Sequence, residues 1–249
     1  MSITHSGRHW RMAVLAAGLL PALAASASAR GPVAQDSMPT VDRVLERYVD
    51  AVGGRAALAR LRTRVVHGAF VEDLPSMGPA APVRFVASAQ VPGKWLVEWR
   101  SAGRVDRIGS DGAIGWEARA DSVRRRDEIM RWKEAFVFDP QGPLRLREHF
   151  HDLVVTGTVR IDGRAAYEVT TDRRDAHYAL YFAVETGLLI RVGYYWDLAD
   201  YREVDGVLVP FRIAQSRKGG SSTFVIDAVE HNAAIETARF AIPDAPRVP

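Results

Sequence analysis

The sequence predicts a mainly β protein of the α+β class, an antiparallel sheet with a few short helices. First, apolar and polar residues alternate in runs of about six to nine residues from Thr63 to Ala233, as in strands with one buried face. Second, turn dipeptides such as Asp162-Gly163 and Asp205-Gly206 separate these runs, as in β-hairpins. No recognisable catalytic motif interrupts the pattern, which therefore favours a binding protein over a catalyst.

Residues 1–29 have the pattern of a cleavable signal peptide. Arg8 and Arg11 precede the apolar stretch Met12–Leu23, and the Ala-Ser-Ala-Ser-Ala run at 25–29 offers cleavage sites. The apolar stretch is about 12 residues, shorter than the roughly 20 that cross a bilayer as a helix. We therefore expect export to the periplasm and a mature protein without an integral membrane segment.

The composition excludes several chemical classes. The chain has no cysteine, which excludes disulfides, thiol catalysis and a cysteine-ligated metal. The formal net charge is +3, and it falls to +1 without residues 1–29, which contain two arginines and no acidic residue. The basic cluster Arg124–Arg126 is followed at once by Asp127 and Glu128, whereas nucleic-acid binders show a continuous basic stripe. We expect no nucleic-acid partner.

The predicted mature chain begins with a polar leader and a short helical region. Residues 30–39 are expected to be disordered, and residues 40–249 form one predicted domain, long enough to bury a single core. Thr40 is a suitable N-cap for a helix over 41–51, whose apolar residues recur at helical spacing. Gly53-Gly54 ends that helix, and a second short helix is expected over 55–61.

Each predicted strand has one apolar face. The residues that share such a face are Val65, His67, Ala69 and Val71; Val83, Phe85, Ala87 and Ala89; Trp95, Val97 and Trp99; Ile114 and Trp116; Tyr178, Leu180, Phe182 and Val184; Leu188, Ile190, Val192, Tyr194 and Trp196; Val207, Val209, Phe211 and Ile213; and Phe224, Ile226 and Ala228. Pro210 cannot donate to a strand ladder, which predicts an edge strand or a bulge there.

Residues 124–150 break the strand pattern. Ile129, Trp132 and Phe136 have helical spacing, the segment 140–143 interrupts it, and residues 144–150 can resume a helix. Two short helices inserted between strands need an apolar partner, so we expect them to lie on a face of the sheet.

The C-terminal third carries a distinctive series of residues. The run Thr-Phe-Val-Ile-Asp-Ala-Val-Glu at 223–230 is followed by Asn232, Ile235, Phe240 and Pro243. This series resembles the final strand and the N-x-x-I…F-x-x-P tail of the LolA/LolB-like superfamily of periplasmic lipoprotein carriers and lipid-binding proteins. Two further segments resemble exported relatives in that superfamily: the D-G-x-x-x-P strand at 201–211 and the helix at 44–54 with its Gly-Gly end.

The resemblance implies a curved, unclosed antiparallel half-barrel. Short helices would cover its concave face and leave an apolar cavity for acyl chains. The apolar strand faces and the two inserted helices fit this arrangement. The implied partner is a lipid, an acyl chain or a lipoprotein, and no cofactor is implied.

Nine aromatic residues are candidates to line such a cavity, because ligand pockets are mostly apolar. The same residues could fill an ordinary core, since aromatic side chains dominate cores as well. Trp132 and Phe136 are the strongest candidates, because a helical lid must contact what it covers. The full set is Trp95, Trp99, Trp116, Trp132, Phe136, Tyr178, Phe182, Tyr194 and Trp196.

Signals for metal binding or catalysis are weak. His149 and His151 would share a face only on a strand, and no third ligand stands at a motif spacing, so no metal site is expected. Asp127 and Glu128 are better explained as solvated helix charges than as an acid–base pair. The sequence has no G-x-S-x-G, P-loop or G-x-G-x-x-G motif, and we expect no enzyme.

The sequence thus favours an exported binding protein that holds a lipid or lipoprotein acyl group in an apolar half-barrel cavity. One alternative is a periplasmic protein-interaction or envelope-sensor domain of the same fold with a filled interior. A second is a hydrolase, which would require a histidine near a carboxylate and a serine at one mouth of the cavity.

Replacing both Trp132 and Phe136 with charged residues should abolish lipid binding and leave the fold intact, because a charged lid cannot cover an acyl chain. Lipid uptake by the purified variant, with circular dichroism as the check on folding, measures this. Unchanged uptake in a folded double variant would contradict the lid assignment.

Overall fold

The computed structural model describes residues 38–244 apart from 75–77, 102, 120, 127–137, 172–177, 194–195 and 218–219. All the described residues belong to one unit of the chain, Met38–Pro249. The predicted signal peptide, most of the predicted leader and the predicted lid residues Trp132 and Phe136 lie outside the described residues.

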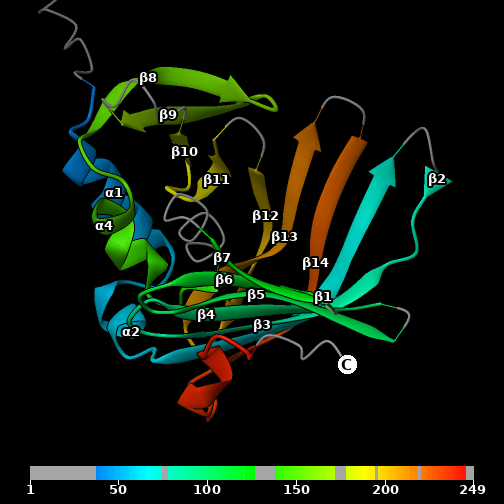
Figure 1. Cartoon of the computed structure of the whole chain (residues 1–249). Coiled ribbons are helices and arrows are strands. Elements are labelled where there is room, and N and C mark those ends of the chain that lie inside the picture. The colour runs from blue at the N-terminus through cyan, green and yellow to red at the C-terminus, as the bar shows by residue number, and fades with distance from the viewer. Residues whose placement is uncertain are drawn as a thin grey trace, which may run out of the picture. The chain divides into compact units, whose positions relative to one another are not determined.

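The unit is mainly β with a few short helices, as predicted (Figure 1). The strands are β1 (Thr63–Leu74), β2 (Gly78–Pro79), β3 (Val83–Gln90), β4 (Lys94–Ser101), β5 (Arg104–Asp111), β6 (Gly115–Arg119), β7 (Ser122–Arg126), β8 (Leu153–Ile161), β9 (Arg164–Thr171), β10 (Ala179–Ala183), β11 (Leu189–Val192), β12 (Trp196–Val204), β13 (Val207–Arg217) and β14 (Gly220–His231). The helices are α1 (Val41–Ala51), α2 (Arg55–Ala59), the 3₁₀ turn η1 (Gly142–Arg145), α4 (Leu146–His149) and the 3₁₀ turn η2 (Thr237–Phe240).

All neighbouring strands run antiparallel, and the sheet is not closed. The strand order is β7-β6-β5-β4-β3-β1-β14-β13-β12-β11-β10-β9-β8, with β2 paired only to β1. Strands β7 and β8 are the two edges, each with one neighbour among the described strands. The chain therefore meanders outward from β1 to the β7 edge, crosses to the β8 edge, and meanders back to β14.

Type I′ hairpin geometry appears at two of the predicted turns. Asp162 and Gly163 both have positive φ, at 48° and 80°, and so do Asp205 and Gly206, at 52° and 79°. That conformation matches the twist of two-residue hairpins, and aspartate followed by glycine adopts it at low cost. These turns therefore fix the register of β8 on β9 and of β12 on β13.

Helix α1 begins and ends where the sequence predicts. The Thr40 Oγ1 accepts a hydrogen bond from the Arg43 N–H at 3.3 Å, and the apolar stripe of the helix is buried. After the helix, Gly53 has φ of 119°, and a Cβ there would lie 2.4 Å from the carbonyl oxygen of Gly206. A glycine at 53 is therefore required for the end of α1 to contact the β12–β13 turn.

The sheet curves around the helices (Figure 1). Strands β8 and β9 lie on one side of α1, α4 and α2, and β3 to β6 lie on the other. We call the sheet face that packs against these helices the inner face. The end of the sheet near the β12–β13 turn, where α1 ends, is the closed end, and the opposite end is the open end.

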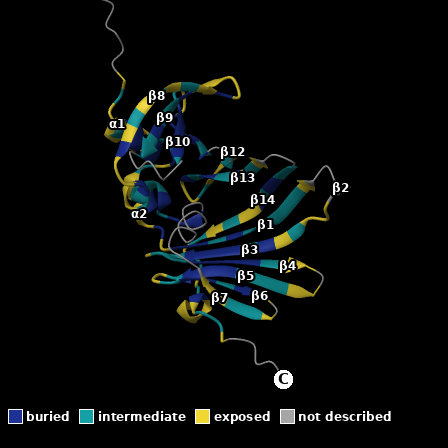
Figure 2. Cartoon of the chain, turned by 45° about the horizontal axis from the view of Figure 1, so that its top comes forward, coloured by how far each residue is buried: buried dark blue, intermediate teal, exposed yellow. Residues whose placement is uncertain are grey.

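Burial is concentrated at the closed end of the sheet, as Figure 2 shows for β3, β4 and β5. Along β4, residues Trp95 to Glu98 are buried whereas Arg100 and Ser101 are exposed. The predicted apolar sets of most strands form this core; its members include Phe85, Ala87, Ala89, Trp95, Val97, Leu180, Phe182, Val207, Val209, Phe211, Ile213 and Ile226.

Four sequence-based expectations were wrong. The apolar face predicted over 188–196 is divided, because Ile190 packs in a different cluster from Leu189 and Val192, and Trp196 begins the separate strand β12. Arg124–Arg126 belong to strand β7 and do not begin a helix, because they pair with β6. Pro210 lies in an interior strand, and it is tolerated because the ladder to β14 begins only at Arg212. In β1 the buried face holds Arg64 and Val66, and the predicted apolar face with Val65 is half-buried.

The helix predicted over 144–150 is confirmed by η1 and α4, and the segment 127–137 lies outside the described residues. Phe138, Leu146 and Phe150 are buried in the core of the inner face. The described part of the connection between the two edge strands therefore packs on the inner face, as an inserted helical segment was predicted to do.

The C-terminal segment covers part of the outer face. Phe240 is 1 % exposed and packs with Leu96, Trp116 and Ala118, and the Trp116 Nε1–H donates to the Phe240 carbonyl at 3.1 Å. The buried Glu98 carboxylate accepts hydrogen bonds from Arg107 at 3.0 Å and from Arg239. The F-x-x-P tail is thus a structural element that fastens η2 to β4, β5 and β6.

Replacing Phe240 with alanine should lower the free energy of unfolding by about 3 kcal/mol, because it leaves a cavity against Trp116. Urea denaturation followed by circular dichroism measures the change. Val154→Ala, at a side chain that is 46 % exposed, is the control and should change stability by less than about 0.5 kcal/mol. Equal midpoints for the two variants would contradict the assigned role of η2.

Candidate functional site

The inner face carries one continuous apolar cluster. Nearly every strand contributes to it, together with α1, α2, η1, α4 and the residues around them. At the closed end its members are fully buried, for example Val66 and Val207. Towards the open end the apolar side chains become half-buried. The inner face is thus a packed core at one end and a partly exposed apolar surface at the other.

Aromatic rings gather around Phe224 at the open half of the inner face, and we call this group the Phe224 cluster. The ring of Phe224 lies 4.9 Å from Phe70, 5.2 Å from Phe85, and 6.2 Å from both Phe138 and Trp196. Phe70, Phe224 and Trp196 are half-buried. One aromatic surface therefore combines side chains from strands β1, β3, β12 and β14 with Phe138.

The structure brings five of the nine predicted aromatic residues to the apolar cluster of the inner face. Trp95 and Phe182 are buried in it, and Trp99, Tyr178 and Trp196 are half-buried against it. Trp116 lies on the outer face against Phe240 and is separated from the others. Trp132, Phe136 and Tyr194 lie outside the described residues. Whether any of the nine binds a ligand stays a prediction.

Sequence reasoning missed three members of the Phe224 cluster as site candidates and misplaced one. The strand patterns place Phe85 and Phe224 on the correct faces, but nothing in the sequence marks them as site residues. Phe70 occupied a position that the β1 pattern assigned to the polar face. Phe138 lies between Phe136, the last residue with helical spacing, and the interruption at 140–143, so no pattern assigns it to a face. The signal that could have found Phe70 is the even-numbered series Val66, Gly68 and Phe70.

Buried polar contacts connect the segment around Asp139 to β1, at the centre of the sheet. Arg64 on β1 is 6 % exposed; its Nε donates to the His231 Nε2 at 3.0 Å, and its Nη1 donates to the Asp139 carbonyl at 3.4 Å. The Asp139 carboxylate accepts from Arg145 Nη1 and from the Gln141 N–H, both at 2.8 Å. The sequence pattern does not reveal this group, because a single arginine in a predicted strand is expected to be exposed.

Burial changes the pKa of the groups around Arg64. It lowers the pKa of Arg64 to about 10, against the opposing effects of Asp139 and Tyr48, so this guanidinium stays charged at neutral pH. Burial, followed by the charge of Arg64, lowers the pKa of His231 to about 4, although Asp205 acts in the opposite direction. Burial also raises the pKa of Tyr48 and Tyr201. At neutral pH the Tyr201 hydroxyl donates to the Leu189 carbonyl at 2.6 Å, and the neutral His231 ring accepts from Arg64.

Among the described residues, no group of three or more histidine, aspartate or glutamate side chains could hold a metal ion. His149 Nε2 lies 3.9 Å from the Asp139 carboxylate, and His151 is exposed.

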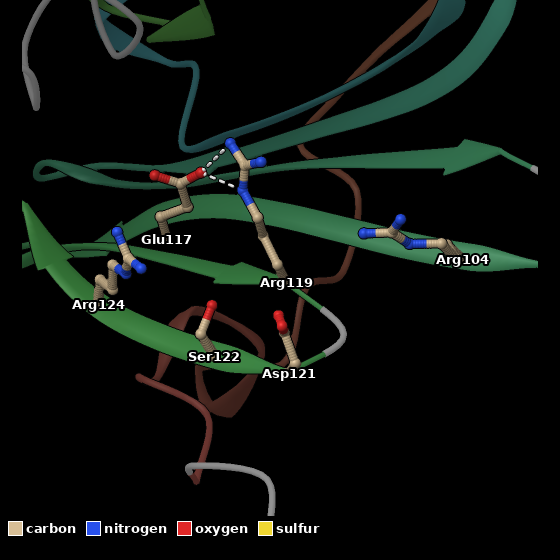
Figure 3. A pocket seen from close by; sticks show the side chains of 6 residues that line it. All are labelled: Arg104, Glu117, Arg119, Asp121, Ser122 and Arg124. Carbon is tan, nitrogen blue, oxygen red and sulfur yellow. Dashed lines mark hydrogen bonds and ion pairs between the residues drawn. The ribbon is translucent and has the colours of Figure 1, made fainter.

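A second candidate site is a charged pocket of about 450 Å³ at the open end of β5, β6 and β7 (Figure 3). The Arg119 Nε and Nη2 both lie 2.7 Å from the Glu117 Oε1. Figure 3 shows this pair between Arg124 on one side and Arg104 on the other. The described lining residues are Arg104, Glu117, Arg119, Asp121, Ser122 and Arg124. All six are charged or polar, unlike the neighbouring apolar cluster.

Comparison with known proteins identifies the fold. No protein-family model matches the sequence, and no curated protein is significantly similar to it. A solved LolA superfamily protein from Nitrosomonas europaea matches with a TM-score of 0.55 and 14 % identity over 82 % of this chain and 98 % of its own. An outer-membrane lipoprotein-sorting protein domain from Vibrio parahaemolyticus matches with a TM-score of 0.56 and 12 % identity over 80 % of this chain and 96 % of its own.

A DUF1329 family protein from Desulfovibrio piger matches with a TM-score of 0.56 and 13 % identity over 81 % of this chain and 97 % of its own. The described unit therefore has the LolA-like fold, a class of unclosed antiparallel sheets with short helices. The resemblance seen in the C-terminal residues is confirmed at the level of the fold. None of the described helices is both long and apolar enough to cross a bilayer.

Acidification should destabilise the protein through His231. Its pKa is about 4 when folded and about 6.5 when unfolded, so above pH 6.5 the neutral ring is present in both states. Between pH 6.5 and 4 the unfolded chain binds the proton more tightly, so stability falls as the pH falls, and below pH 4 this loss is complete. His231→Gln should therefore lose less stability than the wild type between pH 7.5 and 4.5.

Urea unfolding midpoints at several pH values measure this effect. His151→Gln, at an exposed histidine, is the matched control and should follow the wild type. A His231→Gln variant with the same pH profile as the wild type would disprove the role given to His231.

Proposed function

We propose that the protein is an exported, periplasmic binding protein that holds a lipid or a lipoprotein acyl group on the inner face of its half-barrel. One observation carries the proposal: the inner face changes from a packed core at the closed end to half-buried aromatic side chains at the open end. A half-buried apolar surface is the environment that an acyl chain needs.

Two further features support this function. The LolA-like fold is shared with a matched structure named as an outer-membrane lipoprotein-sorting protein domain. The first 29 residues have the pattern of a cleavable export signal. The proposed activity is sequestration. Each CH₂ group transferred from water to an apolar surface contributes about 0.8 kcal/mol to the binding free energy. An acyl chain of ordinary length can thus be held reversibly.

The first experiment is native mass spectrometry of the protein purified gently from a periplasm. A bound mass that denaturation releases as lipid is the expected result. A clean mass of the protein alone, together with no uptake of added fatty acid or phospholipid, would overturn the proposal.

Phe224→Lys should weaken the binding of a fluorescent fatty acid at least tenfold, because it places a charge among the rings of the Phe224 cluster. Val225→Lys is the matched control: the neighbouring side chain is 40 % exposed and points to the opposite face of β14, so its binding should be unchanged. Fluorescence titration of both variants measures the effect.

Trp196→Ala keeps the test usable if Phe224→Lys does not fold, because Trp196 is half-buried and stacks on Phe224 with ring centroids 6.2 Å apart. We expect weaker fatty-acid binding in this variant as well. Wild-type affinity in a folded variant of either kind would exclude the Phe224 cluster as the binding surface.

A further inference from the structure

The charged pocket opens on the same face of the sheet as the apolar cluster. Ile108 on β5 is 5 % exposed and belongs to that cluster, and its register partner on β6 is Glu117. Glu117 in turn pairs with Arg124 on β7. Directly opposed residues of antiparallel strands point to the same face, so these pocket residues lie on the inner face.

The pocket also lies at the open end, beyond the apolar surface. Arg104 is the first residue of β5 and shares the inner face with Ile108, which is four residues, or about 13 Å, further along the strand. Arg119 ends β6 and Ser122 begins β7, opposite each other. A molecule that extends along the inner face from the core towards the open end therefore passes from apolar to charged surroundings.

The charges of the pocket are only partly satisfied by one another. Arg119 is paired with Glu117, and the Arg104 Nη2 lies 3.7 Å from the Asp106 carboxylate, a long contact. Among the described residues, Arg124 and Asp121 have no ion pair or hydrogen-bond partner for their side chains, although the charge of Asp121 acts on Arg119 across the pocket. Arg104, Arg124 and Asp121 are also exposed at the rim, where a ligand can reach them. The pocket thus offers guanidinium groups and one carboxylate to an incoming group.

We propose that this pocket binds the phosphate-bearing head group of a phospholipid whose acyl chain lies on the inner face, with a preference for a head group that carries an ammonium group. The inference rests on the proposed function and adds the ligand class to it. Guanidinium groups match the geometry of phosphate oxygens, which accounts for the arginines. The Asp121 carboxylate attracts the ammonium group, and a volume of about 450 Å³ lies within the range of small-molecule sites.

The test compares ligands that share one acyl chain and differ in the head group. The probes are lysophosphatidylethanolamine, lysophosphatidylglycerol and monoacylglycerol, which has no phosphate, and glycerophosphoethanolamine, which has no acyl chain. Isothermal titration with the full-length mature protein should show the tightest binding for lysophosphatidylethanolamine. Glycerophosphoethanolamine alone should bind at least tenfold more weakly.

Three variants assign the head-group contacts. Arg104→Gln combined with Arg124→Gln should weaken binding of both lysophospholipids about tenfold and leave monoacylglycerol binding unchanged. Asp121→Asn should weaken only lysophosphatidylethanolamine binding. Arg164→Gln, at an exposed arginine of the β8–β9 hairpin, is the matched control and should behave as the wild type.

The outcomes distinguish a failure of the head-group inference from a failure of the proposed acyl-binding function. If the wild type binds monoacylglycerol as tightly as the lysophospholipids and the arginine variants change nothing, the head-group inference is overturned and acyl binding stands. If the wild type binds none of the acylated probes, the proposed function itself fails. Equal binding of glycerophosphoethanolamine and the lysolipid would assign the pocket to a soluble phosphate compound and overturn the lipid assignment.

Discussion

The unclosed sheet is the constraint on which the rest of this structure depends. A closed barrel buries its interior with its own strands, whereas a sheet with two edges must have its apolar face covered by other elements. Here α1, α2, η1 and α4 cover the inner face at the closed end, and Gly53 allows α1 to approach the β12–β13 turn. The covering is graded along the strands, which leaves half-buried aromatic rings at the open end.

Apolar and charged chemistry meet on the inner face at the open end. The Phe224 cluster supplies apolar area, and the rim of β5, β6 and β7 supplies guanidinium and carboxylate groups. This arrangement has the same polarity along the strands as an amphiphile has along its length. On the outer face, Phe240 packs against β4 and β6, and Arg239 donates to Glu98 on β4. The segment η2 therefore supports these strands on the face opposite the charged pocket.

The sequence predicted the fold better than the site. Hairpin turns such as Asp205-Gly206 and the cap at Thr40 follow from local conformational preferences, so they could be predicted without knowledge of the partner strands. The buried face of β1 could not be predicted in this way, because the buried Arg64 is stabilised by His231 and Asp139, which are remote in sequence. Likewise, Trp116 follows the same alternation as Trp95, but its register opposite Gly109, which is opposite Leu96, places it on the outer face under η2.

The pairing of β1 with β14 also determines how this chain must fold. Hairpins on either side of it connect residues that are close in sequence, and such contacts form quickly. Arg64 and His231, by contrast, are 167 residues apart, so this ladder closes a very long loop. The two meanders can therefore form as separate, locally assembled halves, and the rate of reaching the native state is governed by the encounter of their inner strands.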